Sequence, residues 1–505
     1  TKPNILLITA DHMRHDALAC NADLRNPHGL GNSIKTPNLD RLAAEGVTFR
    51  NSFTPNPICV PARASITTGN YSHKCTDSKA NGGEIRKGQR TIATHFAEHG
   101  YTTYAIGKLH YVPYAPPGEE RLLHGFQTAE LNEEGRILRK FDPMGTQRGL
   151  EDYHDYLADH GWPGYERAHG IGNNDVHPSP SPVPAELHEE AWVTDRALHH
   201  LKAHRAGTSE KPFLMWASFS KPHSPYDPPR PYDTLYDPRQ LSEPLGGWEN
   251  EEVMTGRDPE LTRRRTEYGW DKLSKEAVQV ARAFYAGMVT FQDEMIGRLL
   301  AYLDDAGLAE NTIVIYSSDH GDLLGDLGRF FKVCMYDGSV KVPFIWRGPG
   351  VQEPKVPRKQ LVGLQDILPT LCSLTACPLE TNVDGMDLSD VLADPSADGR
   401  HFYVSQSMDS PQQKYMVRTG RWKYMYSQLG GVEELYDTSR DCYEMCNLID
   451  STEYVGVADE LRGTLTTWLQ QNGDEQMLTA EGTLVTSESA GPASFRPGCQ
   501  GWRKY

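Results

Sequence analysis

Short apolar runs that recur along the first 350 residues constrain the fold of this chain more than any other feature. Each run holds five to eight residues, is rich in leucine, β-branched or aromatic side chains, and is bounded by polar or turn-forming residues. Runs of this kind are typical of strands buried on both faces of a largely parallel sheet. The predicted strands are NILLITA (4–10), FLMWASFS (213–220), TIVIYSSD (312–319) and VPFIW (342–346).

Helical patterns lie between these runs. Residues 36–46 carry an N-cap threonine, a proline in the first turn and a closing glycine, and residues 274–307 form a long amphipathic stretch. Strand, helix and strand in repetition predict an α/β core, in which crossover helices flank a mostly parallel central sheet.

The pattern changes near residue 385. Residues 414–428 read as two strands joined by the turn TGR, followed by the run ELYD and a helix over 457–473. This pattern predicts a smaller α+β unit with an antiparallel sheet. The expected division is an α/β domain over residues 1–385 and a C-terminal α+β subdomain with its tail over residues 386–505.

Charge and hydropathy restrict the partners of the chain. The net charge is −17, the isoelectric point is about 5.6, and no run of lysine and arginine is suited to tracking phosphates. We therefore expect no nucleic-acid partner, and an anionic substrate has to be attracted by a local basic pocket. No apolar run approaches the roughly 20 residues that span a bilayer, so we expect no membrane segment.

The start of the chain and its cysteines bear on the compartment. A strand-like run begins at residue 4 with no targeting peptide before it, which favours a cytoplasmic location, or a periplasmic or secreted one if a leader has been removed. Nine cysteines in 505 residues are too few for a disulfide scaffold.

Two of the predicted strands end in residues that bind metals. The first delivers Asp11 and His12, and the third delivers Asp319, His320 and, two residues later, Asp322. Ligands gather beyond the carboxyl ends of strands in an open α/β sheet. Carboxylate oxygens suit hard divalent cations, and a mixed Asp and His set also suits manganese or zinc. The alternative is that each aspartate caps the following helix or turn.

Cys59 lies in an unusual setting. Pro57 and Pro61 stiffen the backbone around it, Arg63 supplies a cation, and ASITTG (64–69) is expected to begin a helix whose N-terminus faces anions. Such surroundings suit a thiolate that attacks a charged substrate. A core thiol, a disulfide half and a metal ligand are the alternatives.

Five segments together resemble the type I sulfatases of the alkaline phosphatase superfamily. PICVPARASITTG contains the first sulfatase signature, Cys-x-Pro-x-Arg, and GYTTYAIGKLH (100–110) is similar to the second. ITADH and SSDHGDLLGDLG resemble the two metal-binding segments, and KPHSPYDPP (221–229) resembles the segment with a further active-site histidine. VRTGRWKYMYS and ELYD extend the likeness into the C-terminal part.

The resemblance implies an alkaline-phosphatase-like fold and two prosthetic features. Cys59 is expected to be oxidised to formylglycine by a formylglycine-generating enzyme, and the hydrated aldehyde is the nucleophile of the family. One divalent ion is expected, calcium first and manganese as the alternative. Many sulfatases carry a second aspartate where this chain has His12, so no direct ligand role is assigned to His12. The implied metal ligands are Asp11, the modified residue 59, Asp319 and His320.

The resemblance also implies a role for each remaining site residue. Arg63 and the metal activate the aldehyde hydrate, and Lys108 binds the hydrate and a sulfate oxygen. His223, with Lys332 beside it, assists the leaving oxygen as a general acid. His110 then removes the proton from the second hydroxyl of the hydrate, so that sulfate is expelled and the aldehyde is regenerated.

The function expected from these residues is hydrolysis of a sulfate monoester. The alternatives are a phosphonate monoester or phosphodiester hydrolase of the same superfamily, and a silent paralogue that binds sulfated ligands. The alcohol part stays open between a small aryl or alkyl group and a monosaccharide. A homo-oligomer is also left open, because the basic and aromatic tail over 494–505 suits either docking onto a neighbouring subunit or a free end.

Overall fold

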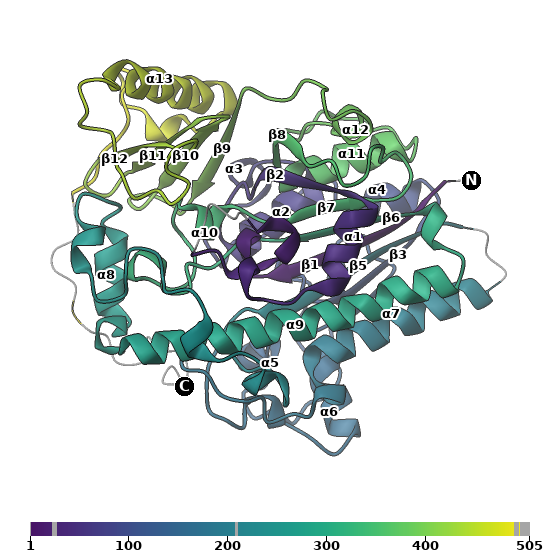
Figure 1. Cartoon of the computed structure of the whole chain (residues 1–505). Coiled ribbons are helices and arrows are strands. Elements are labelled where there is room, and N and C mark those ends of the chain that lie inside the picture. Colours follow the sequence, from purple (N-terminus) through teal and green to yellow (C-terminus); the bar gives the residue numbers. More distant parts are fainter. Residues whose placement is uncertain (1, 23–27, 208–210, 489–493, 495–505) are drawn as a thin grey trace.

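The computed structural model of the chain describes residues 2–22, 28–207, 211–488 and 494 (Figure 1). Nearly all of the tail on which the homo-oligomer hypothesis depends, Cys499 included, lies outside the described residues.

Eight strands form the larger sheet, in the order β4-β3-β5-β1-β6-β7-β2-β8. Neighbouring strands are parallel except at β7, which runs antiparallel to both β6 and β2. The mostly parallel central sheet predicted from the sequence is therefore confirmed. Its strands are β1 (Asn4–Asp11), β2 (Val47–Phe53), β3 (Thr102–Gly107), β4 (Thr128–Leu131), β5 (Phe213–Pro222), β6 (Thr312–Ser318), β7 (Phe344–Arg347) and β8 (Arg358–Gly363).

The central strands are covered on both faces. Every residue of β1, β5 and β6 is buried. Successive side chains of a strand point to opposite faces, so Leu6 and Ile8 enter one apolar core while Ile5 and Leu7 enter the other. Helices α1 (Pro37–Glu45), α7 (Glu189–Ala206) and α9 (Lys275–Asp305) contribute to the first core, and α4 (Ile92–Glu98), α11 (Ile367–Leu374) and α12 (Ser389–Ala393) to the second (Figure 1).

The two helices predicted between the strands of the main sheet, over 36–46 and 274–307, form as α1 and α9 with nearly the expected bounds. Pro37 occupies the first turn of α1, where a missing backbone N–H has no helical partner to lose. The Ser274 side chain caps α9 by accepting the N–H of Ala277.

The smaller sheet is an antiparallel meander in the order β12-β11-β10-β9. Helix α13 (Val455–Asn472) packs Leu461, Leu465 and Trp468 against one face of this sheet. The other face shares a core with the main sheet, in which Met416 and Met425 join Phe53 and Val340. The strands are β9 (Phe402–Ser407), β10 (Lys414–Thr419), β11 (Trp422–Ser427) and β12 (Val432–Asp437).

The domain boundary expected at residue 385 stays a prediction. Strand β9 begins the second sheet at Phe402. Val391 and Leu392 of α12 lie in the core of the main sheet, so the segment immediately after residue 385 packs with the first sheet rather than the second.

The remaining helices are short or lie at the periphery, and among the described residues no helix has the length and apolar character required to cross a membrane. They are α2 (Cys59–Thr68), α3 (Ser72–Cys75), α5 (Arg136–Phe141), α6 (Asp152–Asp159), α8 (Glu260–Glu267) and α10 (Asp337–Val340).

A buried group of three polar side chains, Lys79, Asp474 and Tyr415, connects the second sheet to the main part of the molecule. The Lys79 ammonium bonds both carboxylate oxygens of Asp474 at 3.0 Å and the Tyr415 hydroxyl at 2.9 Å. The Tyr415 hydroxyl also donates to Asp474 at 2.6 Å. The side chains of Lys79 and Asp474 are only 3% and 1% exposed.

Replacing Lys79 with methionine keeps the aliphatic stem but leaves the Asp474 carboxylate buried without its cation. Breaking one partner out of a buried ion pair costs about 3–5 kcal/mol, so we expect a loss of about 3 kcal/mol in the free energy of unfolding, measured by urea denaturation. The control is Lys74→Met. The Lys74 ammonium pairs with Asp384, but the Lys74 side chain is 34% exposed, so the expected loss in the free energy of unfolding is below about 1 kcal/mol. Equal losses in both variants would contradict the prediction.

Candidate active site

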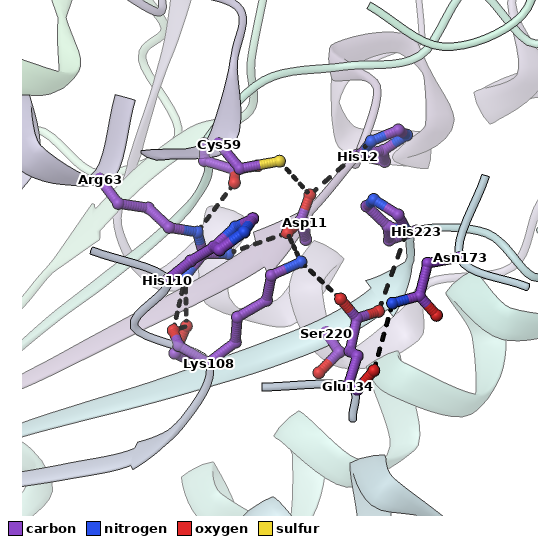
Figure 2. A network of polar contacts seen from close by, with 12 residues as sticks. Asp11, His12, Cys59, Arg63, Lys108, His110, Glu134, Asn173, Ser220 and His223 are labelled. Carbon is purple, nitrogen blue, oxygen red and sulfur yellow. Dashed lines mark hydrogen bonds and ion pairs between the residues drawn. The ribbon is translucent and has the colours of Figure 1, made fainter. Parts of the chain in front are cut away.

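Five adjacent parallel strands end at the same edge of the main sheet, and the polar residues of the site follow their ends (Figure 2). In an open α/β sheet this edge is where ligands bind. Strand β1 supplies Asp11 and His12, β6 supplies Asp319 and His320, β3 supplies Lys108 and His110, β5 supplies His223, and β4 supplies Glu134.

Cys59 enters the site from α2. The sequence predicted that this helix begins at residue 64, but it begins at Cys59 itself. The prediction was wrong because Pro61 was taken as a residue before the helix, whereas proline is tolerated in the first turn, where its missing N–H has no partner. The Cys59 thiol therefore lies at the N-terminus of a ten-residue helix, where the helix dipole favours negative charge.

Cationic and polar groups surround the buried Cys59 sulfur. The Lys332 ammonium lies 2.9 Å from Sγ, His320 Nε2 lies 3.1 Å away, and Asp11 Oδ1 lies 3.7 Å away. Burial alone would raise the pKa of the thiol, but Lys332 and His320 hold the pKa of Cys59 well below its usual range.

Four ligand-type side chains converge on one point. One donor atom each from Asp11, His12, Cys59 and His320 lies within 4.8 Å of the other three. Asp319 Oδ1 lies 3.7 Å from His320 Nε2 at the edge of this group. Carboxylate oxygens and imidazole nitrogens gathered this closely fit a divalent cation, and the group includes His12, to which the resemblance assigned no ligand role.

The Arg63 side chain stabilises this cluster by hydrogen-bonding its carboxylates. Its guanidinium is fully buried and donates to Asp319 at 2.9 Å and to Asp11 at 3.4 Å. A second pair of bonds, both 2.7 Å, goes to the Lys108 carbonyl and the Ser218 hydroxyl. The planar fork of an arginine can make these bonds simultaneously, which a lysine ammonium cannot.

Lys108 lies at the end of β3 between two carboxylates. Its ammonium is 2.5 Å from Asp11 Oδ2 and 2.8 Å from Glu134 Oε2, and the side chain is fully buried. Although burial lowers the pKa of a lysine, the two carboxylates raise the pKa of Lys108. The side chain therefore carries a fixed positive charge at the site.

The two predicted site histidines face the cluster from different strand ends. His110 reaches the Cys59 thiol, and burial together with the Arg136 guanidinium lowers the pKa of His110 to about 3. Burial and the neighbouring His12 ring lower the pKa of His223 well below its usual value, while Glu134 opposes this shift. Both histidines are therefore neutral bases before a substrate charge enters the site.

Lys332 also lies at this site, although it is far from Cys59 in the sequence. Besides Cys59, its ammonium contacts His12 Nε2 at 2.6 Å. The structure thus brings all of the residues selected from the sequence into one site. They are Asp11, Cys59, Arg63, Lys108, His110, His223, Asp319, His320 and Lys332.

Sequence reasoning missed Glu134. It follows β4, which has four residues of which only Leu131 is buried, so no apolar run marks the strand. The only available signal was the pair of carboxylates in ELNEEG, which follows the second sulfatase-like segment by about two dozen residues. In the structure Glu134 contacts Lys108 and faces His223 (Figure 2).

Comparisons with known proteins agree with this architecture. The Sulfatase family model matches residues 3–376, and the model for the N-sulphoglucosamine sulphohydrolase C-terminal region matches residues 325–471. An arylsulfatase of Clostridium perfringens is 32% identical over 477 residues, which cover 92% of this chain and 94% of the relative.

Solved structures share the fold. A phosphonate monoester hydrolase from Silicibacter pomeroyi superposes with a TM-score of 0.76 at 23% identity, covering 95% of this chain and 98% of that one. A structure in complex with D-glucosamine-2-N,6-O-disulfate superposes with a TM-score of 0.72 at 22% identity, covering 94% and 99%.

The mostly parallel sheet with a polar cluster at its carboxyl edge is the alkaline-phosphatase-like fold. With a family model that matches most of its length and a full-length relative above 30% identity, the chain belongs to the sulfatase family and is a sulfuric ester hydrolase.

The variant Arg63→Lys tests whether the hydrogen bonds of Arg63 position the active site. A lysine keeps the charge but cannot hold Asp319, Lys108 and Ser218 together, and a misplacement of about 1 Å in an active site can cost about 100-fold in rate. We expect the turnover of 4-nitrophenyl sulfate to fall about 100-fold. The control is Arg282→Lys, which alters an equally buried arginine that bonds carbonyls outside the site, and which should leave turnover within about threefold of wild type. Similar losses in both variants would assign Arg63 a purely structural role.

Proposed function

We propose that the chain hydrolyses sulfate monoesters with a formylglycine formed from Cys59 and a bound divalent metal ion. The observation that carries this proposal is the position of the Cys59 sulfur, which lies at a helix N-terminus between Lys332 and the group of Asp11 and His320. A residue placed there meets the metal and the anionic ester at the same point.

The proposed metal ligands are Asp11, residue 59, Asp319 and His320. Calcium is the first expectation, and the imidazole nitrogen of His320 makes manganese the alternative. When both are in place, the hydrated formylglycine supplies the attacking hydroxyl and the metal supplies positive charge beside it.

The chain's own residues then handle charge and protons. Lys108 neutralises a sulfate oxygen, and Lys332 holds the ester oxygen that becomes the leaving group. His223 delivers a proton to that oxygen as its bond to sulfur breaks, and His110 accepts the proton released when sulfate departs. The net reaction consumes one water and yields an alcohol and hydrogen sulfate.

The alcohol part is proposed to be a sugar or another small alcohol. The related structure bound to a glucosamine disulfate supports a sugar sulfate, and the basic residues Arg63, Lys108 and Lys332 supply the local positive charge that an acidic chain needs to attract an anion. Maturation in this proposal needs a formylglycine-generating enzyme as a partner.

A phosphonate monoester hydrolase is the second candidate, since the fold of one superposes over nearly the whole chain. Sulfate and phosphonate monoesters are both tetrahedral anions. Lys108 and His110, which match the second sulfatase signature, favour the sulfate ester.

The nucleophile is tested by peptide mass spectrometry of the segment around residue 59, after co-expression with a formylglycine-generating enzyme. We expect conversion of the thiol to the aldehyde, together with hydrolysis of 4-nitrophenyl sulfate in preference to a 4-nitrophenyl phosphonate monoester. Cys59→Ala should remove the activity while the unfolding midpoint stays within about 2 °C. Dominant phosphonate turnover would favour the second candidate, and an unmodified cysteine without either activity would favour a silent binding protein.

Metal dependence is tested by dialysis against a chelator. Removing the ion leaves the carboxylates of Asp11 and Asp319 close together with only the cations of the chain, Arg63 and Lys108, to compensate them, so we expect turnover to fall at least about 100-fold and the unfolding midpoint to drop. Calcium or manganese should restore both, and metal analysis should give one ion per chain. Full activity of metal-free protein would exclude the proposed site.

A further inference from the structure

We propose that Glu134 is a positioning residue for protonation of the leaving group, and that its carboxylate, which lies beside the His223 ring, stabilises the cation that His223 becomes when it takes up the proton for that step. The inference rests on the proposed function, and it adds a residue that lies in none of the sulfatase-like segments of the sequence.

Glu134 is held by one carboxylate oxygen and faces His223 with the other (Figure 2). Oε2 accepts from the Lys108 ammonium at 2.8 Å and from the Arg136 guanidinium at 2.5 Å. Oε1 accepts no hydrogen bond from any described residue, and it lies 3.8 Å from His223 Nδ1. Since the side chain is fully buried, the charge of this carboxylate acts on His223 with little screening by water.

The hydrogen bonds of His223 fix its tautomer. Nδ1 lies 2.6 Å from the carbonyl oxygen of Ser224, which can only accept, so Nδ1 carries a proton. Nε2 is therefore the nitrogen left to exchange a proton with substrate. When Nε2 is also protonated, the ring becomes a cation near Lys108 and Lys332, and Glu134 is the anion that stabilises it.

A closed chain of hydrogen bonds fixes Glu134 relative to His223. The Asn173 side chain donates to the Glu134 carbonyl at 3.2 Å, and the Asn173 carbonyl accepts the Ser224 hydroxyl at 2.6 Å. Ser224 is also the residue whose carbonyl holds His223. The backbone of Glu134 and the imidazole of His223 are therefore connected through the same two residues, Asn173 and Ser224.

The backbone of Glu134 adopts a left-handed conformation. Its φ is 55°, in the left-handed region that costs a residue other than glycine about 1–2 kcal/mol. His12 and His110, at the same site, also have positive φ, 66° and 67°. Conformations of this kind persist where the surroundings fix them and are concentrated at functional sites.

The chemical step balances without proton transfer to Glu134. The attacking hydroxyl oxygen bonds to sulfur and releases its proton to solvent as the bond between sulfur and the ester oxygen breaks. The electron pair of the broken bond goes to the ester oxygen, which takes the proton that His223 Nε2 acquired from solvent when the anionic substrate entered. The imidazole becomes neutral, and Glu134 stays ionised throughout. The carboxylate therefore matters most when the leaving oxygen is strongly basic, because such a group departs only when it is protonated.

The test compares leaving groups in the full-length, formylglycine-containing enzyme. Glu134→Gln keeps the shape of the side chain and removes its charge. We therefore expect kcat on phenyl sulfate to fall about 30-fold or more. On 4-nitrophenyl sulfate, whose phenol is much more acidic and needs less protonation, we expect kcat to fall less than about fivefold. The matched control is Glu151→Gln, which alters a buried carboxyl that precedes α6 and accepts the N–H groups of Glu133 and Gly135 in the loop of Glu134. It should leave the ratio of the two rates unchanged.

A double-mutant cycle assigns the effect to His223. In a His223→Ala background, Glu134→Gln should change kcat on phenyl sulfate by less than about threefold, since the group it positions is gone. An equal fall on both esters in the single variant, or full additivity in the cycle, would overturn the proposal. If Glu134→Gln does not fold, Glu134→Asp, which withdraws the charge from His223, takes its place with the same expected ratio.

These outcomes are separate from a failure of the proposed function. Wild-type enzyme that hydrolyses neither sulfate ester would reject the sulfatase mechanism itself, whereas wild-type turnover with no change of ratio in Glu134→Gln would reject only the role of Glu134.

Discussion

The buried guanidinium of Arg63 is the interaction on which the rest of the active site depends. Two carboxylates, Asp11 and Asp319, lie at the ends of neighbouring strands, and because both are fully buried they would repel each other strongly. Arg63 lies against both and also bonds the Lys108 carbonyl. One side chain thus compensates the acids, fixes the end of β3 and connects α2, where Cys59 begins the helix, to the sheet.

The placement of charge at the site follows from the parallel sheet. Parallel strands bring residues that are hundreds of positions apart to a common edge, so Lys108, His223 and Asp319 meet without any long-range motif. The acidic chain and the cationic site are compatible because Arg63 and Lys108 are fully buried and paired with carboxylates. Lys332 instead contacts Cys59 and His12, so an entering anion can pair with its ammonium.

The elements that sequence reasoning located are those with a strong local signal. Strands β1, β5 and β6 are long and wholly buried, so their apolar runs predicted both the strands and the Asp11 and Asp319 that follow them. The start of α2 was misplaced because Pro61 reads as a helix breaker, although it lies in the first turn. Lys332 came only from resemblance, since it follows no strand and reaches Cys59 through tertiary packing.

Two consecutive glutamates show why the missed part of the site could not be read from composition. Glu133 turns its carboxylate to the backbone N–H groups of Leu109 and His110, and its burial raises its pKa. Glu134 turns the other way, to Lys108 and His223, and the Lys108 ammonium together with the Arg136 guanidinium holds the pKa of Glu134 well below the usual range against its burial. Glu133 thus holds the loop that carries Lys108 and His110. Glu134, the next residue and of the same type, supplies a permanent negative charge. Only the direction of each side chain, set by the left-handed backbone at Glu134, distinguishes the two.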